Sequence, residues 1–549
     1  MSNRKVSIGI ALVLCLVLLG MACTSAGAPV ETSSTPASTP APALSVSLVT
    51  KSGPIEGLYA DEVYAYKGIP YAKAPIGDLR FAPPQDVEPW TAVRDCTQTG
   101  PLSIQKPAMA MFLDTDEQSE DCLSLNVWTP AAPNSGEKLP VYVYIHGGGF
   151  GAGSGNDKTT GGPSFARNGI VTVAVNYRLG TLGFFASEET YKQYGTTGNW
   201  GILDQIKALE WVRDNIADFG GDPSQVTIGG ESAGSWSVSA LILSPLAKGL
   251  FHSAIMESGT VLALHALFPH RGNLEKSIEA SQQIADMFGA EDTPEGLQLL
   301  RQADPIVLDY FAPFAADQVP MHAFFMTPIF DGYVIPKDPV AALQAGDFNQ
   351  VPILIGFNRD EGSLFIQSAV DEKIYKNFAA RILMKDYGAF VERFPVDEQH
   401  SAAQRAQQLT AYALFSACEK VFADTLATDN KVYLYNYNFV APDDPRTSIF
   451  GAYHSSELTY AFNSLDITGR SAPESIKMAG EFHTRLSNFI KNGDPNVGAN
   501  PPTATVWPLY DPADPQVIFF DNEVTTGALP DQENLDFVAR LFHWTDSAH

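Results

Sequence analysis

A serine flanked by glycines, in Gly230-Glu231-Ser232-Ala233-Gly234, is the residue best placed for chemistry in this chain of 549 residues. β-Branched residues predict a short buried strand over residues 226–228, and small and apolar residues predict a helix over residues 233–243. A sharp glycine turn between strand and helix lifts a hydroxyl clear of both and sets it at the helix N-terminus. Ser232 is therefore a candidate nucleophile, which requires a base and a site for an oxyanion.

Three consecutive glycines are a candidate for the oxyanion site. They follow a second predicted strand, residues 139–145, in His146-Gly147-Gly148-Gly149-Phe150. Glycines at the end of a strand expose backbone N–H groups that can approach a tetrahedral oxygen. A glycine hairpin without a catalytic role explains the same residues equally well, so the pattern alone leaves both interpretations open.

The base must be chosen among ten histidines. His454 lies in a loop after a predicted strand at residues 431–439, and this position fits the chain order serine, acid, histidine. His146 lies in the glycine turn, and His252 opens a predicted strand, where a core role is commoner. The spacing favours His454 without excluding the others. A base with an ordinary histidine pKa predicts loss of activity below roughly pH 6–7.

The third group is a carboxylate that orients the imidazole. Asp360 and Glu361 both follow a predicted buried strand at residues 351–357, at the end where open α/β sheets place catalytic groups. Asp331, in an Asp-Gly turn, is another candidate. The pattern does not decide between Asp360 and Glu361.

The elements around these groups predict an α/β fold in one large domain, residues 44–549. A β-branched run at residues 170–175 predicts a strand buried on both faces, and residues 204–215 have helical spacing. Strands that alternate with helices predict a mostly parallel central sheet with helices on both faces. A helix-rich segment, residues 260–328, predicts a cap. Short antiparallel strands are expected near the N-terminus, at residues 45–50, 54–59 and 62–67.

The N-terminus differs in composition from the body. Arg4 and Lys5 precede an apolar run over residues 6–20, which predicts a signal peptide over residues 1–22 and an exported protein. The following Met21-Ala22-Cys23 resembles a bacterial lipobox and implies a lipidated Cys23 that tethers the protein to a membrane, although Gly20 departs from the usual pattern. The alternative is ordinary cleavage, giving a secreted or periplasmic product. Residues 23–43, rich in Ser, Thr, Pro and Ala, predict a flexible tether.

Composition excludes several classes of partner. A net charge of −27 argues against nucleic acid as a partner. No H-E-x-x-H, EF-hand loop or Cys/His cluster occurs, so neither a metal nor an organic cofactor is predicted. We expect a monomer.

In an exported protein Cys96 and Cys122 would form a disulfide, whereas Cys418, in an apolar helical stretch, predicts a free thiol.

Jointly, the motifs resemble those of the type-B carboxylesterases, an α/β-hydrolase family that includes cholinesterases, bile-salt-activated lipases and neuroligins. Their order covers the chain from residue 44 to the C-terminus. Besides the glycine turn and the serine motif, they are Gly68-Ile69-Pro70-Tyr71-Ala72, Glu120-Asp121-Cys122-Leu123, Asn176-Tyr177-Arg178-Leu179-Gly180, Phe219-Gly220-Gly221-Asp222-Pro223, Leu250-Phe251-His252-Ser253-Ala254-Ile255, Asp331-Gly332 and Asn492-Gly493-Asp494-Pro495-Asn496.

The resemblance implies an α/β-hydrolase fold with a helical cap, and a serine hydrolase that cleaves carboxylic esters through an acyl-enzyme. The roles that it implies are a triad of Ser232, Glu361 and His454, an oxyanion hole of the Gly148, Gly149 and Ala233 N–H groups, a buried polar network of Glu231 and Ser258, and an acyl-pocket segment with His322 and Phe324.

Two departures from the family bear on details. An arginine usually pairs with the glutamate that matches Glu120, but Lys67 stands at its position and lacks the bidentate fork. In cholinesterases a tryptophan in the loop between the matching cysteines holds choline, whereas residues 96–122 contain Phe112 and no tryptophan. We therefore expect neutral esters of short to medium acyl chains. A lipase-like or cholinesterase-like specificity is the alternative, and a non-catalytic adhesion protein is the rival class.

Overall fold

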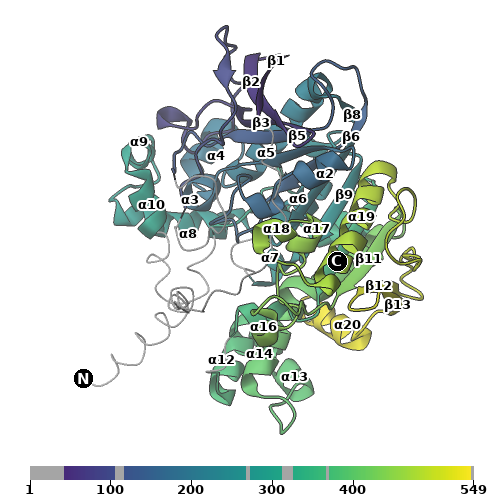
Figure 1. Ribbon diagram of the computed structural model, residues 1–549. Coiled ribbons are helices and arrows are strands. Elements are labelled where there is room, and N and C mark those ends of the chain that lie inside the picture. The colour runs from purple at the N-terminus through teal and green to yellow at the C-terminus, as the bar shows by residue number, and fades with distance from the viewer. Residues whose placement is uncertain (1–42, 106–116, 268–272, 312–325, 367–369, 546–549) are drawn as a thin grey trace, which may run out of the picture.

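A 13-stranded sheet runs through the molecule (Figure 1). The structure, a computed structural model, describes residues 43–105, 117–267, 273–311, 326–366 and 370–545. The strands lie in the order β1-β2-β3-β5-β7-β6-β8-β9-β10-β11-β12-β13, with β4 beside β2. Their bounds are β1 Leu44–Thr50, β2 Gly53–Ala60, β3 Val63–Pro70, β4 Arg94–Asp95, β5 Ser124–Thr129, β6 Leu139–Ile145, β7 Val171–Val175, β8 Gly221–Glu231, β9 Ser253–Glu257, β10 Ile353–Asn358, β11 Val432–Tyr437, β12 Gln516–Phe520 and β13 Thr525–Ala528.

The middle of this sheet is parallel and its edges are antiparallel. Neighbouring strands from β7 to β12 all pair in parallel, whereas β1, β2, β3 and β5 form an antiparallel edge and β13 closes the other edge against β12. In Figure 1 the first edge is purple, and β12 and β13 lie at the lower right. Parallel strands need crossover connections, which helices supply on both faces. The α/β-hydrolase fold with an antiparallel start is thereby confirmed.

Alternate side chains of β6 show how both faces are covered. Val141, Val143 and Ile145 belong to one core, together with α5 (Trp200–Asn215) and α6 (Ala233–Leu243). Tyr142 and Tyr144 belong to a second core with α2 (Pro163–Arg167) and α19 (Pro473–Asn492). The odd and even positions of a strand point to opposite faces, so helices pack on each side of the sheet.

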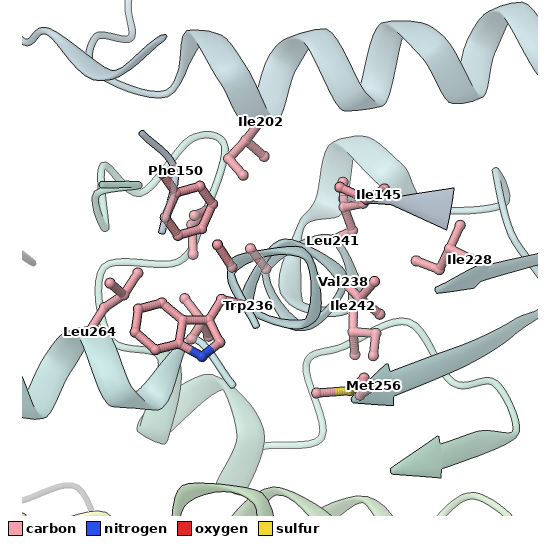
Figure 2. Close-up of a cluster of buried hydrophobic side chains, with 14 of the residues drawn as sticks. Ile145, Phe150, Ile202, Ile228, Trp236, Val238, Leu241, Ile242, Met256 and Leu264 are labelled. Atoms are coloured by element: carbon pink, nitrogen blue, oxygen red, sulfur yellow. The ribbon is translucent and has the colours of Figure 1, made fainter. Parts of the chain in front are cut away.

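Helix α6, which carries the serine turn at its start, is buried along its whole length. Figure 2 shows Val238, Leu241 and Ile242 of this helix in one cluster with side chains from the strands and from α5. In the interior each large apolar side chain of this helix contributes about 1.5–3 kcal/mol of burial free energy. The serine turn therefore rests on a helix that is buried throughout.

Two groups of helices interrupt the parallel strands. Between β9 and β10 lie α7 Leu262–Leu267, α8 Leu274–Met287, α9 Pro294–Gln302, α10 Pro305–Phe311 and α11 Pro339–Gln344. Between β10 and β11 lie α12 Glu372–Leu383, α13 Tyr387–Arg393, α14 Ala402–Ala411, a π-helical turn Tyr412–Ser416 and α15 Ala417–Leu426. Figure 1 shows α12, α13 and α14 extending beyond the sheet. The remaining helices are α3 Gly180–Phe184, α4 Glu188–Tyr194, α16 Thr447–Phe450, α17 Leu458–Ala461, α18 Leu465–Thr468 and α20 Gln532–Leu541.

The predicted Cys96–Cys122 disulfide is wrong for this structure, in which both cysteines, like Cys418, are buried free thiols. The Cys96 backbone is held by hydrogen bonds to Glu56 and Lys67, and the Cys122 thiol is hydrogen-bonded to Ser103. Burial raises the pKa of Cys96 and of Cys122 to about 12. A disulfide requires two side chains that point at each other, and neither export nor spacing carries that information.

Glu120 pairs with an arginine, Arg80, in place of Lys67. The guanidinium of Arg80 donates two hydrogen bonds to the Glu120 carboxylate, at 2.7 and 2.5 Å. It also donates to the carbonyls of Leu300 and Ala303, at 2.9 and 2.7 Å. Arg80 therefore supplies the bidentate fork that Lys67 lacks, and it ties the N-terminal segment to α9.

Several predictions fall on residues 1–42 and 312–325, which lie outside the described residues. These are the signal peptide, the tether up to residue 42, Cys23, His322 and Phe324. Within the described ranges, no helix combines the length and the hydropathy needed to cross a bilayer.

Candidate active site

Ser232 occupies the sharp turn between β8 and α6. Its φ of 57° and ψ of −123° are unfavourable for a residue with a side chain. The surrounding backbone holds this conformation: the Ser232 N–H donates to the Glu257 carbonyl and its own carbonyl accepts from Trp236, both at 2.9 Å. The hydroxyl therefore stands at the helix N-terminus, as the glycine pattern predicts.

The glycines of the motif allow this turn to press against the end of β6. A Cβ atom on Gly230 would lie 2.4 Å from the Gly234 carbonyl carbon, and one on Gly234 would lie 2.1 Å from the Ile145 oxygen. Both approaches are closer than any real Cβ contact, so only glycine fits at either position. The G-x-S-x-G pattern is thus a packing requirement of the turn.

His454 and Glu361 meet behind this turn, although 93 residues separate them. His454 Nδ1 lies 2.7 Å from Glu361 Oε2, and both side chains are buried. The other Glu361 oxygen, Oε1, accepts from the Ser258 hydroxyl at 2.6 Å and from the Asn358 N–H at 2.7 Å. The carboxylate is therefore fixed from both sides and can orient one tautomer of the imidazole.

Asp360, the other acid candidate at this strand end, holds the loop that carries His454 against the end of β10. Its N–H donates to the Ala452 carbonyl at 3.0 Å, and its Oδ2 accepts from the Ala452 N–H at 2.9 Å. Asp331 accepts hydrogen bonds from the N–H groups of Tyr333, Val334 and Ile335, as expected of a turn residue. Neither Asp360 nor Asp331 contacts His454 in the described structure.

A second carboxylate faces the other nitrogen of His454. Nε2 lies 3.2 Å from Glu231 Oε1, which also accepts from the Ser455 hydroxyl at 2.5 Å. Burial alone would lower the pKa of His454, but the carboxylates of Glu231 and Glu361 outweigh it and raise this pKa to about 9. Burial raises the pKa of Glu231. Among the described residues, no hydrogen bond joins the Ser232 hydroxyl to His454.

The other histidine candidates serve the fold. His146 stacks on Tyr177 with ring centroids 4.5 Å apart, and burial lowers its pKa to about 4, which keeps the ring neutral. His252 precedes β9, whose far end, Glu257, pairs with Glu231 beside the serine. His252 therefore lies at the opposite end of the strands from Ser232.

The glycine turn after β6 lies directly against the serine turn. A Cβ atom on Gly147 would lie 2.5 Å from the Glu231 carbonyl oxygen and 3.2 Å from Ser232 Cβ. Gly148 and Gly149 have φ values of 102° and 62°, which are not strand conformations, so their N–H groups do not take part in strand pairing. Within the described ranges, the N–H groups of Gly148, Gly149 and Ala233 donate to no other protein atom. Three unused donors near one serine are what an oxyanion requires.

The sequence analysis misses three buried glutamates around this site: Glu257, Glu419 and Glu457. Each is shielded completely from solvent. Burial, followed by repulsion from neighbouring carboxylates, raises the pKa of Glu457 to about 8 and holds those of Glu257 and Glu419 well above their usual range. The available signal is an acid within an apolar helical run, which Glu419 shows beside Cys418.

Two phenylalanines flank the histidine ring. The centroid of Phe415, from the π-helical turn, lies 4.5 Å from that of His454, and the centroid of Phe365 lies 5.2 Å from it. Phe365 is 40% exposed, whereas Phe415 is buried. Phe365 is therefore the solvent-accessible ring beside His454, and Phe415 is the buried one.

Known proteins share this architecture and sequence. The model of the carboxylesterase family matches residues 44–538. Liver carboxylesterase 1F of Rattus norvegicus is 34% identical over 512 residues, covering 84% of this chain and 88% of the relative. Liver carboxylesterase of Sus scrofa is 35% identical over 499 residues, covering 83% and 85%.

Solved structures agree with these relatives. A PNB esterase superposes with a TM-score of 0.77 at 30% identity, covering 89% of this chain and 99% of that one. A carboxylesterase of Geobacillus stearothermophilus gives a TM-score of 0.75 at 31% identity, covering 90% and 99%. The family match spans nearly all of the described body, including the serine turn and the histidine loop. The chain belongs to the carboxylesterase family and is a carboxylic ester hydrolase of the α/β-hydrolase fold.

Proposed function

We propose that Ser232 is the nucleophile of this esterase, His454 its general base and Glu361 the acid that orients the base. The observation that carries this assignment is the 2.7 Å contact between His454 Nδ1 and Glu361 Oε2, with Nε2 3.2 Å from Glu231, the residue before Ser232. The geometry matches the roles of a serine, histidine and carboxylate triad.

The reaction proceeds in two steps. Ser232 Oγ attacks the ester carbonyl while His454 Nε2 takes its proton, and the imidazolium then protonates the departing alcohol. Water, deprotonated by the same nitrogen, attacks the acyl-serine and releases the acid. The N–H groups of Gly148, Gly149 and Ala233 stabilise the oxyanion in both steps, a contribution of about 3–4 kcal/mol per donor.

Glu231 and Ser258 support these steps from behind. Ser258 fixes Glu361 through its 2.6 Å hydrogen bond, and Glu231 lies 3.2 Å from the nitrogen that receives the proton. We propose that the Ser232 hydroxyl turns toward Nε2 when substrate binds, since apo sites commonly show this contact loose or unformed. Glu231 then stabilises the imidazolium that forms in each step.

We propose neutral esters with short to medium acyl chains as substrates. Trp200 and Tyr177 are aromatic residues that could replace the missing choline-binding tryptophan, but both are hydrogen-bonded inside the protein. The Trp200 indole N–H donates to the Phe185 carbonyl, and the Tyr177 hydroxyl donates to the His146 carbonyl. Both are fully buried. Phe365 remains, and a phenylalanine ring attracts a cation less than a tryptophan does.

We further propose that the protein is exported. The support is the charged and apolar pattern of residues 1–22, followed by the tether of residues 23–43. Lipidation at Cys23 would hold the esterase body at a membrane surface, whereas cleavage without lipidation would release it.

Covalent labelling tests the triad. A fluorophosphonate should label one serine per molecule, and peptide mapping should place the label on Ser232. Ser232→Ala should lower kcat by about 10⁶-fold with an unchanged thermal midpoint, because triad members act as a unit. Ser224→Ala, which removes an exposed serine at the start of the same strand, is the matched control and should keep full activity. A label on any other serine overturns the assignment.

A further inference from the structure

The turn that follows β9 holds the triad acid in place. Ser258, whose hydroxyl binds Glu361 Oε1, has a φ of 63°, and Gly259 has a φ of 120°. A serine with positive φ is strained, so its conformation persists only where neighbours fix the backbone. The direction of the Ser258 hydroxyl therefore depends on what holds this turn.

Contacts on both sides of Gly259 fix it. The Gly259 N–H, which belongs to the peptide joining it to Ser258, donates to Glu419 Oε1 at 2.6 Å. The Gly259 carbonyl accepts from the Ser235 hydroxyl of α6 at 2.5 Å. Glu419 is thus the only side chain in the described structure that holds the peptide directly after the serine.

Glu419 reaches the turn from an irregular helix that also contacts the base. The π-helical turn Tyr412–Ser416 precedes α15, and its Phe415 packs on the His454 ring. Glu419 lies one turn further along and has no exposed surface. Single π-helical turns inside α-helices are frequent at functional sites. One helix therefore touches the histidine and, through Gly259 and Ser258, the acid.

We propose that Glu419 is a positioning residue for the triad acid: it anchors the Gly259 N–H, which directs the Ser258 hydroxyl onto Glu361. The proposal rests on the function proposed for Ser232, Glu361 and His454. Its chemical requirement is one hydrogen-bond acceptor at Oε1, at the length of a glutamate side chain.

The acceptor does not need a negative charge. Glu419 Oε2 has no hydrogen-bond partner in the described part of the chain. Burial holds the pKa of Glu419 well above its usual range, and the carboxylates of Glu361, Glu457 and Glu257 raise it further. A neutral amide of the same length should therefore serve as well as the acid.

Three variants separate these requirements. Glu419→Met keeps the volume but removes the acceptor and should lower kcat by about tenfold to hundredfold with KM nearly unchanged, since small displacements of catalytic groups cost rate. Glu419→Asp keeps the acid but falls short of Gly259 and should show the same loss, which preserves the test if the methionine variant does not fold. Glu419→Gln keeps an acceptor at the same length and should therefore retain kcat within about threefold of the native value.

A double-mutant cycle tests the route through Ser258. If Glu419 acts on Glu361 through the Ser258 hydroxyl, Ser258→Ala and Glu419→Met together should lose no more kcat than the worse single variant. Multiplying losses would show independent, structural effects and overturn the proposal. Glu481→Gln, at another glutamate without exposed surface, is the matched control for altering a buried acid and should leave kcat unchanged.

The outcomes are distinguishable from failure of the triad assignment. If the fluorophosphonate does not label Ser232, the proposed function fails. If Ser232 is labelled while folded Glu419→Asp keeps native kcat, only the positioning role of Glu419 fails. Equal losses in Glu419→Gln and Glu419→Met would also overturn it, because the acceptor alone would then be insufficient.

Discussion

The Nε2 atom of His454 lies 3.2 Å from Oε1 of Glu231, the residue immediately before the serine. The nitrogen that we propose receives the serine proton therefore has an acidic side chain beside it. With Glu361 on Nδ1, the ring lies between two buried carboxyl groups. An opposite charge within a few ångströms favours the imidazolium, and the neutral base is correspondingly harder to regenerate.

The first prediction concerns pH. Since the pKa of His454 is raised to about 9, the base is protonated below that range, and kcat/KM should decline on the acid side well above the pH 6–7 expected of an isolated histidine. Glu231→Gln removes one carboxylate and should move the midpoint down by about 1–3 pH units. Glu279→Gln, at an exposed pair with Lys276, is the control and should leave the midpoint unchanged. A midpoint that stays fixed in Glu231→Gln would remove Glu231 from the titration.

The second prediction concerns stability. Arg80 and Glu120 form a nearly buried pair, with side chains 5% and 10% exposed. Arg80→Met should lower the free energy of unfolding by about 3–5 kcal/mol, because Glu120 would remain charged without its partner. Arg213→Met breaks an exposed pair with Asp214 and should cost less than about 1 kcal/mol. Urea denaturation of both variants measures the difference, and equal losses would contradict the role assigned to Arg80.

The third prediction concerns the cysteines. Native protein should react negligibly with a thiol reagent, because Cys96, Cys122 and Cys418 are buried and the pKa of each is raised by burial to about 12. Unfolding in denaturant without reductant should expose three free thiols in the body of the protein. A count of one free thiol would contradict this structure and show that Cys96 and Cys122 pair after export, as the sequence analysis predicts.

Local patterns predict the centre of the fold well. Strand β6 and helix α6 have the predicted bounds, since β6 is an apolar run that ends just before the glycine turn and α6 begins directly after Ser232. Strand β8 begins five residues earlier than predicted, at Gly221, because pairing with Leu139 extends a segment that reads as a turn. Tertiary pairing overrides local preference in such cases.

The proposed triad and its neighbours Glu231 and Ser258 follow from the sequence motifs, but the contacts of Glu419 and Arg80 do not. The Glu361–His454 contact follows from the family motifs, whereas Glu419 meets Gly259 only because the fold brings α15 to the turn after β9, 160 residues away in the chain. Nothing in the spacing of a single glutamate records that contact. The spacing of Arg80 and Glu120 likewise does not predict their pairing, because it depends on the path of the chain between them.

The last prediction concerns substrate charge. Cation–π attraction is worth about 0.5–2 kcal/mol, so the absence of a tryptophan could remove up to roughly 30-fold of choline preference. Against this, a net charge of −27 steers cations toward the protein, although salt weakens the effect. Near the site, Phe365 offers one accessible ring, with its centroid 5.2 Å from that of His454. We expect the missing indole to outweigh both.

The measurement compares butyrylcholine with the uncharged 3,3-dimethylbutyl butyrate at about 0.15 M salt, where long-range attraction is screened beyond roughly 8 Å. Similar kcat/KM values for the two esters are expected. Phe365→Trp places a stronger cation-binding ring at the same position and should shift the ratio toward the choline ester. A native ratio more than about tenfold in favour of choline, worth about 1.4 kcal/mol of transition-state binding, would contradict a preference for neutral esters.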